Sequence, residues 1–366
     1  MNLMIVLLFS VVLMALSGLP GMLFPARSPV GQRLATAALT LGGALGAAAT
    51  LLAMASGIWP SLDLSWGLGG SRFSVGLDAL GACFLLPVFV VPALASFYGL
   101  AYWRQSEHPA NGQRLALSFG VLAGAMALVV LARDGTLFLI AWELMALAAY
   151  FAATAEDDKQ EVRRAGWVYL IATHTGTLCL FAMFALWRHA TGSAALAPGQ
   201  AVTPHTAGIL FALTLVGFGF KAGLMPLHVW LPGAHANAPS HVSAVMSGVM
   251  LKMGVYGIVR MTALLPTGPA WWGYTVLAAG AASSVAGIAF AVGQRDLKRL
   301  LAYSSIENIG IIAMGVGLAL LGRACGQPVW VTLGLGGALF HTWNHSLFKP
   351  LLFLNAGAVI HATGTR

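Results

Sequence analysis

Charge is the scarcest feature of this sequence. Only 8% of its 366 residues are Asp, Glu, Lys or Arg, whereas 58% are hydrophobic. Soluble globular domains carry about 25% charged residues, so the composition excludes that class. The length is sufficient for about eleven apolar segments of roughly 20 residues, the length that one bilayer crossing requires. The sequence therefore predicts an all-α polytopic membrane protein.

The short motifs of redox and hydrolytic sites are also missing. The three cysteines, Cys83, Cys179 and Cys325, lie far apart, and no CxxC or Cys/His metal spacing occurs. This argues against iron–sulfur, zinc and c-type haem sites. No glycine-rich loop follows a strand, and no Walker loop occurs. We therefore expect this chain to hold no cofactor, no metal and no catalytic residue of its own.

Basic residues outnumber acidic ones, 19 against 11, without clustering as a nucleic-acid-binding face requires. They lie instead at the ends of apolar runs. Ten of them fall in odd-numbered loops and five in even-numbered loops. The positive-inside rule then places the odd loops in the cytoplasm and the N-terminus outside. We expect a multi-pass protein of a bacterial-type inner (plasma) membrane with no nucleic-acid partner.

The breaks between apolar runs predict eleven spans. They are expected at residues 3–24, 34–58, 76–101, 115–132, 135–153, 163–187, 207–226, 240–262, 271–292, 300–321 and 329–361. The last run is long enough to bend or to extend past the bilayer.

Three lysines lie inside these runs, namely Lys221, Lys252 and Lys349, in a chain with only five lysines. A lysine at bilayer depth costs several kcal/mol unless it faces protein or water, so it marks a candidate ion or proton pathway. Prolines at 226, 232 and 239 predict a broken helix near 221–239. Irregular backbone at that depth survives only against protein or a hydrated cavity, as in a transporter site.

Glu143, in LFLIAWELMALAAYF, is the clearest acid within a span, and we expect it to pair with Lys221. Making and breaking that contact would load and release a proton, whereas a static pair would only fix helix packing. Lys252 is expected deep in its span, with a snorkelling contact toward Arg260 as the alternative. Glu307 lies about two turns into the tenth span and is expected to be partly solvated.

Histidines form a second set of candidates. His341, His345 and Lys349 recur every four residues and share one face of the eleventh span. Imidazole titrates near neutral pH and can relay protons, so this face predicts a proton path. A pair of histidines at this spacing can also chelate a metal, but no third ligand is in view.

Four further histidines are open to two interpretations each. His174, in the middle of the sixth span, is either a packing residue or a member of the relay. The others flank the broken segment, where they either line a water path or lie at the membrane interface. These three are His228, His235 and His241.

Four stretches carry a family resemblance. They are WELMALAAY, GFKAGLMPLHVWLPGAHANAPSHVSAVMSGVMLKMGVYGIVR, RDLKRLLAYSSIENIGII and HSLFKPLLFLNAGAVIH. They resemble antiporter-like subunits of respiratory complex I, of Mrp-type cation/proton antiporters and of membrane-bound hydrogenases. The motifs HAxAPSxVSAxxSGVMxKxGxYG and SSIENIG look closest to those of the hydrogenase-4 and formate hydrogenlyase branch. The resemblance covers roughly residues 70–366.

The resemblance implies inverted repeats of five helices, each with a broken helix. Residues 1–114 would then hold helices 1–3, residues 115–262 the first repeat, and residues 263–366 an incomplete second repeat. It also implies a proton channel in which Glu143 pairs with Lys221, Lys252 forms the central relay, and the eleventh-span group leads onward. Redox partners in such complexes are separate subunits.

The implied function is proton translocation within an energy-converting oxidoreductase complex, beside other membrane and redox subunits. Two rivals stay open: a Mrp-type Na⁺/H⁺ antiporter subunit and a non-conducting membrane scaffold. Many relatives have an acid where this chain has Gly233. The second broken helix should follow the eleventh span, but the sequence ends at HATGTR. We therefore expect either a piece of a longer subunit or an exit half-channel supplied by another chain.

Overall fold

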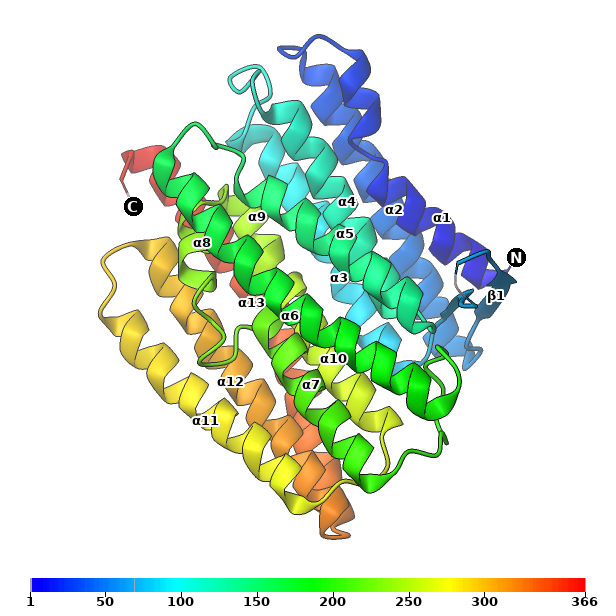
Figure 1. Ribbon diagram of the computed structural model, residues 1–366. Coiled ribbons are helices and arrows are strands. Elements are labelled where there is room, and N and C mark those ends of the chain that lie inside the picture. Colours follow the sequence, from blue (N-terminus) through cyan, green and yellow to red (C-terminus); the bar gives the residue numbers. More distant parts are fainter. Residues whose placement is uncertain (1, 69, 366) are drawn as a thin grey trace.

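A computed structural model describes residues 2–68 and 70–365 and is almost entirely helical (Figure 1). Long apolar sequences form helices here because a bilayer leaves no other way to pair backbone polar groups within one segment. The helices are α1 (Leu3–Ala15), α2 (Pro29–Ser56), α3 (Ala79–Tyr102), α4 (Gly112–Leu131), α5 (Gly135–Ala153), α6 (Gln160–Thr191), α7 (Pro204–Ala222), α8 (Leu231–Asn237), α9 (Ser240–Val245), α10 (Leu251–Leu264), α11 (Ala270–Val292), α12 (Leu297–Ala324) and α13 (Pro328–Thr363). A short 3₁₀ turn, η1 (Leu19–Leu23), follows α1, and a π-helical turn, η2 (Met246–Met250), joins α9 to α10.

Ten segments among the described residues are long and apolar enough to cross a membrane. They match the first ten predicted spans. The eleventh prediction falls on α13, a helix of 36 residues with Pro350 inside it, which is not among those ten. The prediction of a multi-pass, all-α membrane protein is confirmed.

The broken helix expected near 221–239 is present. Helix α7 ends at Ala222, where Gly223 adopts the left-handed conformation (φ +79°) that favours glycine. A turn and the short α8 follow, and the chain breaks again before Pro239 and re-enters a helix at Ser240. The segment therefore consists of two short pieces between long helices.

The centre of the molecule is the segment that follows this break. In Figure 1, α1 and α2 lie at one edge, α11 and α12 at the other, and α9, α10 and α13 between them. The most apolar stretch of Ser240–Leu264 is buried along its whole length. Lys252 therefore lies on the most enclosed helix of the bundle.

A β-hairpin between α2 and α3 was not predicted. Strands β1 (Ser61–Ser65) and β2 (Arg72–Gly76) pair antiparallel, with Ser61 opposite Gly76. Residues 61–75 fall between the second and third predicted spans, where two strands of five residues leave little signal beside long apolar runs. An isolated bridge from Val75 to Ala132 attaches the hairpin to the α4–α5 junction.

Candidate functional site: a buried row of lysines and histidines

Lys221 lies in the last turn of α7 with only 2% of its surface exposed. Its Nζ donates a hydrogen bond to the Tyr169 hydroxyl at 3.3 Å. The ammonium group also lies 5.5 Å from the Trp142 ring centroid and 5.4 Å from that of Tyr169. Aromatic faces attract a cation, so α5 and α6 provide an enclosure that tolerates this charge away from water.

Glu143 does not form the predicted ion pair with Lys221. Its Oε2 lies 3.4 Å from Nε2 of His174, and its buried Oε1 has no hydrogen-bond partner among the described residues. Instead of contacting each other, the Lys221 ammonium group donates to the Tyr169 hydroxyl and the Glu143 carboxylate contacts His174. Glu143 still acts on Lys221 electrostatically, so the two groups belong to one cluster.

The ring of His174 has a defined relation to Glu143. Its Nδ1 lies 2.9 Å from the Leu170 carbonyl and must donate to that oxygen. The Nε2 atom that faces Glu143 then carries a proton only when the ring is cationic. His174 therefore contacts Glu143 directly, and its membership of the relay stays a prediction.

Lys252 points away from Arg260, so the snorkelling alternative is wrong. Its Nζ donates to the Ser247 carbonyl at 2.5 Å and also contacts Nδ1 of His345 on α13. Arg260 is occupied by Asp78, at 2.6 and 2.7 Å. Lys252 is 1% exposed, and its partners lie toward the π-helical turn.

The tautomer of His345 depends on the charge of Lys252. When Lys252 is an ammonium group it can only donate, so Nδ1 of His345 accepts and the ring proton lies on Nε2. That Nε2 is buried and has no partner among the described residues. The pair therefore presents one hydrogen-bond donor that is free to pass a proton onward.

The other two members of the predicted α13 face bind to α12. His341 Nε2 lies 2.9 Å from Asn308 Oδ1, and Lys349 Nζ donates to Ser304 Oγ at 2.9 Å. Glu307 joins them, because its Oε2 accepts from Asn308 at 3.2 Å and from Ser304 at 3.3 Å. Hydrogen bonds therefore connect His341 to Lys349 through α12.

The half-buried side chain of Glu307 agrees with the expectation that it is partly solvated, but its contacts with Ser304 and Asn308 were not predicted. A usable signal was present, since Ser304, Glu307 and Asn308 have the i, i+3, i+4 spacing of one helical face. Tyr169, the partner of Lys221, was missed for a different reason, because nothing in the sequence relates positions 52 residues apart.

The row has two breaks. His341 and His345 have ring centroids 6.5 Å apart and share no hydrogen bond. Between the Lys221 and Lys252 clusters, a weak contact runs from the Tyr169 hydroxyl to Met250 Sδ at 4.0 Å. A proton could cross such gaps only through water or through movement of side chains.

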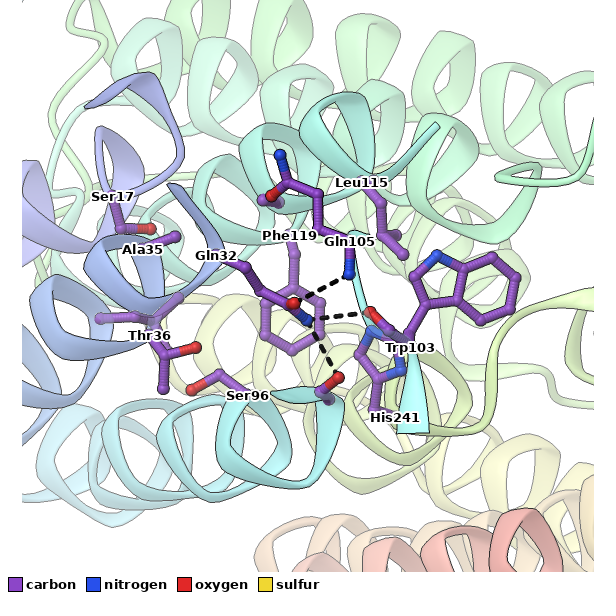
Figure 2. Close-up of a pocket in the computed structure, with 14 residues that line it drawn as sticks. Ser17, Gln32, Ala35, Thr36, Ser96, Trp103, Gln105, Leu115, Phe119 and His241 are labelled. Carbon is purple, nitrogen blue, oxygen red and sulfur yellow. Dashed lines mark hydrogen bonds between the residues drawn. The ribbon is translucent and has the colours of Figure 1, made fainter. Parts of the chain in front are cut away.

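The three histidines near the break have different surroundings. His235 is fully buried, stacks on Phe353 at 5.0 Å, and has no hydrogen-bond partner for either ring nitrogen among the described residues. His241 is also buried, on the wall of a cavity (Figure 2). His235 and His241 are therefore enclosed by protein, whereas His228 is half-buried, and the choice between a water path and the membrane interface stays a prediction for all three.

An ion-pair cluster at the opposite end of α10 was also unforeseen. Asp78 caps α3 and binds Arg260, and Arg133 Nη2 lies 3.4 Å from its Oδ2. Burial raises the pKa of Asp78, but the Arg260 hydrogen bond and the charges of Arg133 and Arg260 outweigh it. The pKa therefore lies below its ordinary value of 3.8. No grouping of three His, Cys, Asp or Glu side chains suited to a metal occurs within residues 2–68 and 70–365.

Comparison with known proteins gives consistent matches. The family described as "NADH:quinone oxidoreductase/Mrp antiporter, TM" matches residues 132–366. The chain is 40% identical over 289 residues to "Hydrogenase-4 component B" of Escherichia coli, covering 78% of this chain and 43% of the relative. It is 34% identical over 328 residues to "Formate hydrogenlyase subunit 3" of the same organism, covering 89% of this chain and 52% of the relative.

A solved structure agrees with these matches. A chain in the "Structure of Mrp complex from Dietzia sp. DQ12-45-1b" superposes with a TM-score of 0.83 at 28% identity, over all of this chain and 38% of that one. The resemblance drawn from the four sequence stretches is confirmed. The chain spans about half the length of the curated relatives it matches.

Proposed function

Because the chain belongs to the NADH:quinone oxidoreductase/Mrp antiporter family of membrane subunits, we propose that it moves protons within an energy-converting oxidoreductase complex. The observation that carries the proposal is the buried contact between Lys252 and His345. It joins the helix after the break to α13 at the most enclosed part of the bundle. Burying an ammonium group beside an imidazole is costly, so a purely structural site has little reason to keep both.

The arrangement supports a stepwise transfer. In the proposed sequence, Glu143 released from His174 approaches Lys221 and favours the protonated lysine, and return of Glu143 to His174 weakens that hold. The proton on Lys221 then passes by way of Tyr169 and water toward Lys252, which shares it with His345. From there His341, Asn308, Glu307, Ser304 and Lys349 form the onward path.

Several finer assignments belong to this proposal. The division into helices 1–3 (1–114), a first repeat (115–262) and an incomplete second repeat (263–366) stays a prediction. So does an N-terminus on the outer side, with the cytoplasmic side bearing the loops rich in Lys and Arg. The partners we propose are the other membrane subunits and the redox subunits of the complex.

Proton pumping by the native complex in proteoliposomes tests the proposal. Glu143→Ala and Lys221→Ala should each lower the pumping rate by about tenfold or more, because each removes a group that holds the proton. Lys159→Ala is the matched control, since that lysine pairs with Glu156 at 2.6 Å on the exposed surface. Undiminished pumping in both buried variants, with normal assembly, would refute the proposal.

The match to the Mrp structure favours one rival, a subunit that exchanges Na⁺ for H⁺ without a redox partner. The same vesicles separate the two, because replacing Na⁺ by choline would abolish exchange in the rival case and leave redox-driven pumping intact. Co-purification decides further: hydrogenase or dehydrogenase subunits support the proposal, and a set of small antiporter subunits supports the rival.

A further inference from the structure

A surface pocket lies where α2 begins and α3 ends, away from the row of lysines. Its volume is about 430 Å³, within the range of about 300–1,000 Å³ that small-ligand sites have. We call it the arginine pocket, because two of its seven lining residues are arginines. The lining residues are Pro29, Gln32, Arg33, Leu100, Arg104, Gln105 and Ser106.

The charge of the arginine pocket is unbalanced. No acidic side chain lines it among the described residues. The Arg33 side chain makes no hydrogen bond or ion pair within the described part of the chain. Arg104 pairs with Glu107 at 3.3 Å, but both side chains are more than half exposed, so this pair is weak. Two guanidinium groups on one wall repel each other, and an anion between them would relieve that repulsion.

The two sides of the pocket are held in place by Gln32. Its side-chain amide donates to the carbonyls of Gly99 and Trp103 at 3.0 and 2.9 Å (Figure 2). Its amide oxygen accepts from the N–H of Gln105 at 3.0 Å. These bonds tie the first turn of α2 to the end of α3. The backbone that bears the two arginines is therefore fixed before any ligand binds, which lowers the entropic cost of binding.

Below the pocket, both helices expose large apolar side chains. Leu41 follows Arg33 by eight residues on one face of α2, and Phe97 precedes Leu100 by three on α3. Leu41, Leu94 and Phe97 are 54%, 61% and 52% exposed. Because α2 and α3 are long and apolar enough to cross a membrane, these side chains would face acyl chains. A cationic pocket therefore continues into an apolar surface, which suits a ligand with a charged head and a hydrocarbon tail.

We propose that the arginine pocket binds the phosphate group of an anionic phospholipid, with its acyl chains along the exposed faces of α2 and α3. The guanidinium groups of Arg33 and Arg104 bind the phosphate oxygens, because their planar forks match that geometry. The Ser106 hydroxyl, which lines the same pocket, supplies a further donor. This lipid site does not depend on the proposed proton pathway.

The membrane side agrees with this ligand. The pocket lies among the loops that hold most of the Lys and Arg residues, and the positive-inside rule places such loops at the cytoplasmic leaflet. That leaflet carries the anionic lipids, and basic pockets between helices on this side are suited to their headgroups.

Native mass spectrometry of the purified native complex, titrated with dioleoyl phosphatidylglycerol, tests the site. Arg33→Gln and Arg104→Gln should each weaken binding of one lipid by about fivefold, because each removes a cation close to the headgroup. Arg33→Lys should lose less, since it keeps the charge without the planar fork. Arg164→Gln is the matched control, because it removes the same charge from the exposed start of α6, outside this pocket. Unchanged binding in both glutamine variants, or an equal loss in the control, would overturn the proposal.

Three further arms separate the lipid from other occupants. Phosphatidylcholine should bind less tightly than phosphatidylglycerol, and this preference should disappear in the double variant Arg33→Gln/Arg104→Gln. Glycerol 3-phosphate, which has the phosphate but no acyl chains, should not displace the lipid. Displacement would instead indicate a site for soluble anions and would overturn the proposal. A cryo-EM map of the native complex in phosphatidylglycerol nanodiscs should show lipid density between the two arginines, and a neighbouring subunit's side chain there would also overturn it.

Discussion

Each buried lysine of this chain has a different kind of neighbour, and the neighbour determines what the lysine can do. Lys221 has two aromatic rings and a hydroxyl, Lys252 has a carbonyl and an imidazole, and Lys349 has a serine hydroxyl. None of the three makes an ion pair within 4 Å among the described residues. No carboxylate therefore neutralises these ammonium groups by direct contact. Such an arrangement suits proton transfer better than static ion pairing.

The contrast with Asp78 shows what a static cluster looks like. That carboxylate binds Arg260 with two hydrogen bonds at 2.6 and 2.7 Å and receives a cap hydrogen bond from the Gly81 N–H at 2.7 Å. Asp78→Asn keeps the cap and removes the charge. Because the side chain is 39% exposed, we expect a loss of only about 1–2 kcal/mol in the free energy of unfolding.

The pH dependence of stability checks the same residue. The pKa of Asp78 is lowered in the folded state, so its contribution is fully present above 3.8 and is lost as the pH falls through the lowered value. Unfolding curves in detergent should converge for wild type and Asp78→Asn at acid pH and separate near neutrality. Asp63→Asn is the control, because its pair with Arg72 is more than half exposed. Equal stability at neutral pH would contradict the account.

At the scale of single residues, the sequence predicted which side chains share a helical face but not which residues they contact. The four-residue repeat of His341, His345 and Lys349 placed all three on one helical face, which the unbroken α13 confirms. Their partners could not be predicted, because Lys252 lies 93 residues from His345 in the chain. The Glu143–Lys221 pair failed for a similar reason, since Tyr169 and His174 on α6 bind the two groups separately.

The broken helix and α13 act as one unit. Gly248, in the π-helical turn, lies against Pro350 so closely that an added Cβ would come 2.2 Å from its Cγ. This close approach brings His345 to Lys252. The prolines predicted the break, but the π-helical turn has no sequence signature, since it depends on how α13 packs.

Gly248→Ala tests that packing. The new methyl group must push α13 away, so we expect about 1–3 kcal/mol of destabilisation and slower pumping as His345 moves from Lys252. Gly336→Ala, on α13, is the control, because nothing lies within 4 Å of its added Cβ and alanine favours a helix. Thermal unfolding of both variants in detergent measures the difference. A wild-type transition for Gly248→Ala would show that the approach is not needed.

At the scale of the whole molecule, the apolar runs predicted the order and approximate limits of the helices. Bilayer thickness and backbone hydrogen bonding leave few alternatives for such runs. The hairpin of β1 and β2 was not predicted, because it depends on pairing between two short strands in the stretch that links two apolar runs. The cavity beside His241 was not predicted either, because it forms only where α2, α3 and α4 meet the start of α9.

The bundle encloses its ionisable groups at two levels, with His241 and Lys298 near one end and the row from Lys221 to Lys349 in the middle. A scaffold that only holds neighbouring subunits would not need protonatable groups at either level. The scaffold alternative and the conducting alternative therefore make the most different predictions for substitution of Lys252, which the rest of the bundle encloses.

The most direct measurement is the number of protons pumped per catalytic turnover by the native complex carrying Lys252→Met. Methionine fills nearly the same space without an ammonium group, so assembly and electron transfer should persist. The account predicts that coupling between turnover and pumping is lost. Wild-type coupling in an intact Lys252→Met complex would contradict it and leave the chain a scaffold.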